Sequence, residues 1–153
     1  EKARRAGEGS AEVLAQLHKV PGCEDLTWDD VQIASTIFAV KPGDGSAREQ
    51  AASCQRVLGA GANIVTEYAT KRYRSNLINW GMLPLQLVGA TPFGLGDYVF
   101  IPNVREALKG DLQDIKAYVL GDSVKEFSLY MAPLTADERK ILADGCLINF
   151  YKN

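Results

Sequence analysis

The sequence predicts an α/β fold with parallel βαβ units, a small meander or barrel-like sheet and a C-terminal helix. Strand-like and helix-like stretches alternate over residues 33–88, short strand-like stretches separated by turns follow over residues 97–130, and a helix signal begins at Thr135. The chain has 153 residues, 46% hydrophobic and 24% charged, which fits one globular domain. We therefore expect a single domain over residues 1–153, with residues 1–30 as a helical or irregular lead-in.

Apolar spacing and turn residues define the first elements. Residues 10–19 predict a helix capped by Ser10, and the β-branched and aromatic residues over 33–40 predict a buried strand. A turn over residues 41–45 leads into a second predicted helix over residues 46–58, which two following glycines end.

The alternation continues with a strand over residues 62–68, a helix over residues 70–80 and a strand over residues 82–88. This order implies parallel strands joined by crossover helices, which are nearly always right-handed.

The second half of the chain has a different pattern. Short strands are predicted over residues 97–102, 115–120 and 123–130, as in a meander or small barrel-like sheet. Thr135 then caps a closing helix with an acidic first turn.

Charge and hydropathy exclude several classes of function. The net charge of -2 gives no general attraction to nucleic acid or to anionic membranes. The longest apolar runs, residues 33–40 and 82–88, are far shorter than the roughly 20 residues of a membrane-spanning helix. No signal peptide is visible, so we expect a cytoplasmic protein. Because the sequence begins with Glu1, we expect it to be part of a longer polypeptide.

The three cysteines, Cys23, Cys54 and Cys146, are widely spaced and form no Cys-x-x-Cys pair. We expect free thiols in a reducing compartment and no metal site within the chain. Cys54 falls on the apolar side of the helix predicted over residues 46–58, where we expect it to serve packing rather than redox chemistry.

The segment most suited to chemistry joins the strand over residues 33–40 to the helix that follows it. Ser46 is expected at or next to the helix N-terminus, where free N–H groups and the helix dipole attract anions. Gly43 and Gly45 allow positive φ and close approach of a ligand, and Arg48 offers a forked guanidinium to a carboxylate. The same positive field favours a serine alkoxide as a base. The alternative interpretation is structural: Ser46 is an N-cap, and Glu49 completes a capping box.

Three segments, in order, resemble one family. Residues 43–52, Gly-Asp-Gly-Ser-Ala-Arg-Glu-Gln-Ala-Ala, resemble the motif Gly-x-Gly-Ser-Ser-Arg-Glu-His-Ala of the aconitase-family swivel domain. Residues 74–85 resemble a later segment with an Asn-Leu pair followed by Gly and Leu-Pro-Leu, and residues 134–151 resemble the C-terminal helix of that family. The resemblance covers residues 33–151.

The resemblance implies the swivelling β/β/α domain of an aconitase-like hydro-lyase that reversibly dehydrates a hydroxy di- or tricarboxylic acid. By position, Ser46 matches the catalytic base and Arg48 a carboxylate-binding arginine, with Gly45 and the backbone of Ala47 also at the substrate. The [4Fe-4S] cluster of the family would be bound by other domains or by a large subunit, so the isolated domain is expected to be inactive.

Two departures from the family pattern leave alternatives open. Ala47 stands where the family has a second serine, and neither Arg4 nor Arg5 matches a further substrate arginine upstream. One alternative is the small subunit of an isopropylmalate isomerase. The other is a catalytically degenerate relative with a regulatory or RNA-binding role.

Other candidate residues have plainer interpretations. His18 is the only histidine and is expected on a helix surface, so it offers no relay for Ser46. The basic group Lys71, Arg72 and Arg74 is expected to be a solvated helix face. Ser75 and Asn76 are expected to form hydrogen bonds with the backbone near the site. Trp28 and Trp80 are expected to pack in a core or between domains.

Overall fold

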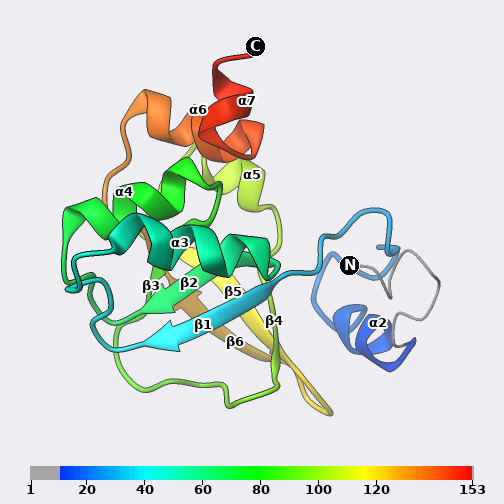
Figure 1. Ribbon diagram of the computed structural model, residues 1–153. Helices are drawn as coiled ribbons and strands as arrows, with labels where there is room; N and C mark the ends of the chain where they lie inside the picture. The colour runs from blue at the N-terminus through cyan, green and yellow to red at the C-terminus, as the bar shows by residue number, and fades with distance from the viewer. Residues whose placement is uncertain (1–10, 153) are drawn as a thin grey trace. The chain divides into compact units, whose positions relative to one another are not determined.

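The computed structural model describes residues 11–152, which form two compact units (Figure 1). It has a parallel sheet of three strands, a small antiparallel sheet and C-terminal helices, so the predicted α/β fold class is confirmed. No helix within the described residues has the length and hydrophobicity that a membrane crossing needs. The first unit comprises residues 11–33, 89–102 and 116–128, and the second comprises residues 34–88, 103–115 and 129–152.

The second unit is built on the parallel sheet, with strand order β1-β2-β3. Strands β1 (Ser35–Ala39), β2 (Ala60–Val65) and β3 (Leu83–Gln86) are joined by helices α3 (Arg48–Val57) and α4 (Lys71–Asn79). Figure 1 shows α3 and α4 together over one face of the sheet. The predicted alternation of strands and helices is therefore confirmed.

The prediction that residues 33–40 form a buried strand is correct for the strand and wrong for its burial. The strand exists as β1, but Ile37 and Phe38 are 38% and 42% exposed. The reason is its place in the sheet: β1 is an edge strand, whereas β2 has a neighbour on each side and buries Ile64 and Val65. A run of β-branched residues predicts a strand but does not distinguish an edge from a centre.

The core between the sheet and its two helices centres on Tyr73 of α4. Its buried members are Ala52, Ala60, Tyr73, Leu77 and Met82, with Tyr68 and Trp80 packed against them. Helix α3 contributes Ala52, and its opposite side, with Ala51 and Cys54, is exposed. The expectation that Cys54 serves packing is therefore wrong, because α3 turns that side of the helix away from the sheet.

The rest of the second unit consists of helices α5 (Val104–Ala107), α6 (Ala136–Asp144) and α7 (Leu147–Phe150), and α6 packs against α4 and α7. Helix α6 begins with the predicted cap. The Thr135 hydroxyl accepts from the Glu138 amide at 3.2 Å, and the Glu138 carboxylate accepts from the Thr135 amide at 2.9 Å. Helix α5, of four residues, was not predicted, and α7, also of four residues, is a separate helix within residues 134–151, which were expected to resemble one C-terminal helix.

The first unit combines helix α2 (Ala11–Leu17) with most of the antiparallel sheet. Its strands are β4 (Tyr98–Phe100), β5 (Ile115–Leu120) and β6 (Lys125–Leu129), in the order β4-β5-β6. This arrangement confirms the predicted meander. The predicted cap Ser10 lies outside the described residues. The core of this unit is formed by Leu17, Val20, Cys23 and Leu120.

Gly81 after α4 and Gly145 after α6 bring the ends of these helices together. Gly81 has φ +71°, and a Cβ there would overlap the Gly145 carbonyl oxygen. We expect Gly81→Ala to lower the free energy of unfolding by about 3 kcal/mol, from about 1–2 kcal/mol for the left-handed backbone and the rest for the overlap. Gly59→Ala is the control, since Gly59 has φ +98° but no atom within 4 Å of such a Cβ. Urea unfolding that gives equal losses for both variants would contradict this account.

Candidate functional site

The loop between β1 and α3 places Ser46 beside a helix N-terminus, as predicted. Helix α3 begins at Arg48 with Ala47 as its N-cap, and no side chain caps its first turn. Ser46 is exposed immediately before this cap. The alternative interpretation of Ser46 as N-cap in a capping box with Glu49 is therefore wrong, and the positive end of α3 faces solvent without a side-chain acceptor.

Glu49 has a different partner from the one that a capping box would provide. Its carboxylate accepts a hydrogen bond from the indole Nε1–H of Trp80 at 2.9 Å. Trp80 follows α4 and packs against the core, so this bond joins the start of α3 to the end of α4. The only acidic side chain in the first turn of α3 is thereby held by Trp80 rather than by the helix N-terminus.

The two glycines of the loop have different roles. Gly43 has φ +95°, and a Cβ on it would lie 2.5 Å from three carbon atoms of Tyr73. The positive φ expected there is confirmed, but the close approach is to Tyr73. Gly45 has no positive φ, so that expectation is wrong for it; a Cβ on it would meet nothing within 4 Å. The chain around Gly45 is therefore open to a ligand.

Arg48 is half-buried in the first turn of α3, and its guanidinium is only partly bonded. Its Nη2 donates to the Asp44 carbonyl oxygen at 3.5 Å, which is a long contact. Its Nε is buried and has no hydrogen-bond partner. A forked guanidinium in this state has donors left for a planar anion such as a carboxylate.

The described residues do not fit a metal cluster. Among residues 11–152, no group of three or more His, Cys, Asp or Glu side chains could hold a metal ion. All three cysteines are free: Cys23 is buried in the first unit, Cys54 is exposed on α3 and Cys146 is half-buried. Burial raises the pKa of the Cys23 thiol, which disfavours the thiolate that a metal requires.

The remaining candidates from the sequence are His18, Lys71, Arg72 and Arg74. Their contacts give none of them a role in acting on a substrate. His18 is half-buried rather than on a surface, because its Nε2 lies 2.7 Å from the Leu26 carbonyl oxygen. Lys71 and Arg72 are exposed, as expected of a solvated helix face. Arg74 differs, since its Nη2 donates to the carbonyl oxygens of Ala132 and Pro133 at 2.8 and 3.0 Å.

Three residues around the loop were not singled out from the sequence. The Thr70 hydroxyl donates to the Gly43 carbonyl oxygen at 2.9 Å, a role expected of Ser75 or Asn76. The Tyr73 hydroxyl accepts from Asn63 at 2.8 Å. These pairs are 27 and 10 residues apart in the chain. The available signal was the position of Thr70 at the start of a predicted helix, which indicates an N-cap but not the second hydrogen bond of its hydroxyl.

Tyr68, next to these residues, is not a candidate base. Burial raises the pKa of its hydroxyl, which therefore stays protonated and donates to the Leu85 carbonyl oxygen at 3.3 Å.

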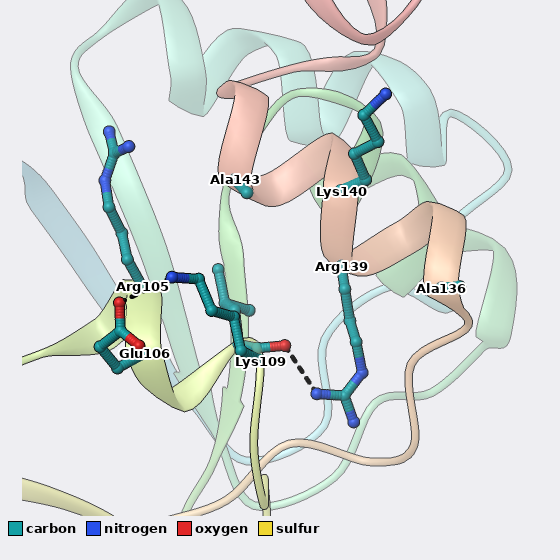
Figure 2. Close-up of a pocket in the computed structure, with 8 residues that line it drawn as sticks. Arg105, Glu106, Lys109, Ala136, Arg139, Lys140 and Ala143 are labelled. Atoms are coloured by element: carbon teal, nitrogen blue, oxygen red, sulfur yellow. Dashed lines mark hydrogen bonds and ion pairs between the residues drawn. The ribbon is translucent and has the colours of Figure 1, made fainter.

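A pocket of about 420 Å³ between α5 and α6 is a second candidate site (Figure 2). Three of its four cations are already engaged: Lys109 pairs with Glu106 at 2.8 Å, Arg139 donates to two backbone carbonyl groups, and Lys140 lies over the Phe150 ring. Figure 2 shows the charged ends of Arg105, Arg139 and Lys140 pointing in different directions. They do not converge on one anion, so the Ser46 loop is the better candidate. The lining residues are Arg105, Glu106, Leu108, Lys109, Ala136, Arg139, Lys140 and Ala143.

Comparison with known families gives one match over this part of the chain. Residues 22–89 match the aconitase C-terminal domain, a stretch that contains Ser46, Arg48 and the second resembling segment at residues 74–85. The third resembling segment, residues 134–151, lies outside the match and stays a prediction. No curated protein matches the chain significantly. The matched stretch contains the loop of Ser46 and the two helices that hold it, so this part of the chain is similar to the C-terminal domain of the aconitase family.

Proposed function

We propose that the chain supplies the proton-abstracting side of an aconitase-like hydro-lyase active site, with Ser46 as general base and Arg48 as a carboxylate-binding residue. The observation that carries this proposal is the pairing of an exposed serine with an uncapped helix N-terminus and a partly bonded arginine. The match of residues 22–89 to the aconitase C-terminal domain supports hydro-lyase chemistry in general. The substrate class, a hydroxy di- or tricarboxylic acid, belongs to the proposal.

Ser46 acts on the carbon next to a substrate carboxylate. In its alkoxide form, Oγ takes the proton from that carbon, the C–H electron pair forms the double bond, and hydroxide leaves from the neighbouring carbon. A serine alkoxide is a high-energy base, and the dipole of α3 and the charge of Arg48 both lower its energy. Hydration is the reverse, with the protonated Ser46 returning its proton to carbon.

Arg48 orients the substrate for this step. A carboxylate that approaches the end of the guanidinium accepts from its two Nη groups together, which fixes the plane of the carboxylate. The long contact from Nη2 to the Asp44 carbonyl is easily exchanged for such a bond. The Gly45 region leaves space beside it, and the backbone of Ala47 lies between the two functional side chains.

The remainder of the site lies elsewhere in this proposal. The family generally uses a [4Fe-4S] cluster, and the residues described here do not fit one. We assign the cluster to other domains of the same polypeptide or to a large subunit, which would complete the site opposite Ser46.

Replacing the base tests the first assignment. In the full-length enzyme, Ser46→Ala should lower kcat by about 10²- to 10⁴-fold, the usual contribution of general-base catalysis, with little change in KM. Turnover is followed by the absorbance of the unsaturated acid. Ser53→Ala is the control, because Ser53 lies on the same helix and bonds only the Gln50 carbonyl. Normal turnover of the Ser46→Ala enzyme would rule out the base assignment.

Replacing the arginine tests the second assignment. Arg48→Gln removes a charge-assisted pair of hydrogen bonds and should lower kcat/KM by about 10- to 100-fold, chiefly through KM. Arg72→Gln removes the same charge from an exposed position on α4 and should have little effect. Equal effects of the two substitutions would mean that Arg48 acts only through the overall charge.

A further inference from the structure

The loop that carries Ser46 lies alongside the loop that follows β2. The backbone ladder between β1 and β2 continues beyond both strands: the amides of Thr66, Glu67 and Ala69 donate to the carbonyl oxygens of Ala39, Val40 and Pro42 at 3.2, 2.9 and 3.0 Å. Lys41 and Glu67 form an ion pair across the same two segments at 3.1 Å. The first loop is therefore held against the second as far as Pro42.

Thr70 adds the last bond of this series. Its hydroxyl donates its only proton to the Gly43 carbonyl oxygen at 2.9 Å and accepts from the Tyr73 amide at 3.2 Å. This one hydroxyl therefore caps α4 and also fixes Gly43, the last residue of the Ser46 loop that is bonded to the second loop. Beyond Gly43, within the described part of the chain, residues 44–46 make only one hydrogen bond, the long contact from Arg48 to the Asp44 carbonyl oxygen.

Tyr73 fixes the other side of the same loop. Its ring lies against Gly43, before Ser46, and its hydroxyl accepts from Gln55 of α3 at 2.9 Å, after Ser46. Because Ser46 lies on a short exposed span between these two attachments, the position of Oγ depends on where Gly43 and α3 are held.

We propose that Thr70 is a positioning residue for Ser46: by holding the Gly43 carbonyl, it sets the place from which the proposed base reaches the substrate. This inference rests on the proposed function of Ser46. Thr70 itself touches neither substrate nor Ser46 in this role. Its contribution is to keep the flexible span short, so that the base spends more of its time within reach of the C–H bond.

The rival explanation is that Thr70 only caps α4, and the chain offers a matched control for it. Thr135 is the other threonine whose side chain caps a helix in the described residues, and its hydroxyl likewise accepts from the amide three residues on. It makes no bond to the Ser46 loop. Thr70→Val and Thr135→Val each remove one cap, but only Thr70→Val releases Gly43.

The experiment compares Thr70→Val, Thr70→Ser and Thr135→Val in the full-length enzyme. Thr70→Val should lower kcat by about 10- to 100-fold with KM within about 2-fold, since a small misplacement of a reacting group has this effect. Thr70→Ser keeps the hydroxyl and should restore most of kcat. Thr135→Val should lower the unfolding midpoint and leave kcat within about 2-fold. Equal loss of kcat in Thr70→Val and Thr135→Val, or no rescue by Thr70→Ser, would overturn the inference.

A second measurement separates this inference from the proposed function. Amide hydrogen exchange of Glu67 and Ala69, whose amides bond the Val40 and Pro42 carbonyls of the Ser46 loop, should speed up in Thr70→Val and not in Thr135→Val, whether or not Ser46 is the base. If Ser46→Ala leaves turnover intact, the proposed function fails while the exchange result still shows whether Thr70 holds the loop. Unchanged exchange in Thr70→Val would overturn the positioning role directly.

Discussion

The packing of Tyr73 is the constraint on which the second unit depends. This side chain is 2% exposed, and it contacts Gly43 with its ring while its hydroxyl accepts from Asn63 of β2 and Gln55 of α3. A hydroxyl buried without a partner would cost about 1–3 kcal/mol, so the two amides make the burial of the ring possible. One residue of α4 thereby sets the spacing of the sheet, of α3 and of the loop between them.

Local patterns were enough to predict the order of elements but not their surroundings. The alternation over residues 33–88 identifies β1, α3, β2, α4 and β3, because each element has its own hydrophobic period. The buried side of α3 carries Ala52 and the half-buried Gln55, a polar residue whose partner Tyr73 lies 18 residues away. Hydrophobicity alone therefore favours the wrong side, the one that carries Cys54. The four-residue helices α5 and α7 are too short for any period to show.

The candidate site, too, could be predicted where it depends on residues that are neighbours in the sequence, but not where it depends on residues far apart in the sequence. The place of Ser46 next to a helix N-terminus follows from the neighbouring glycines and the helix-forming residues after it, so it was predicted from the sequence. The bonds that orient the loop join residues 27 and 31 positions apart, Thr70 to Gly43 and Trp80 to Glu49. No spacing rule relates such residues, because the packing of α4 beside α3 brings them together.

The charges of the loop explain why a site built on it would be incomplete. A serine alkoxide and a di- or tricarboxylate bring three or four negative charges to one place. Against them, the loop offers one unit from Arg48 and about half a unit from the dipole of α3. The carboxylates of Asp44 and Glu49 add further negative charge nearby, although the bond from Trp80 holds the Glu49 carboxylate by a donor outside the helix. Most of the compensating charge must still come from outside the loop. In the proposed enzyme, the partner domain therefore supplies both the leaving-group chemistry and the positive charge that allows Ser46 and its substrate to meet.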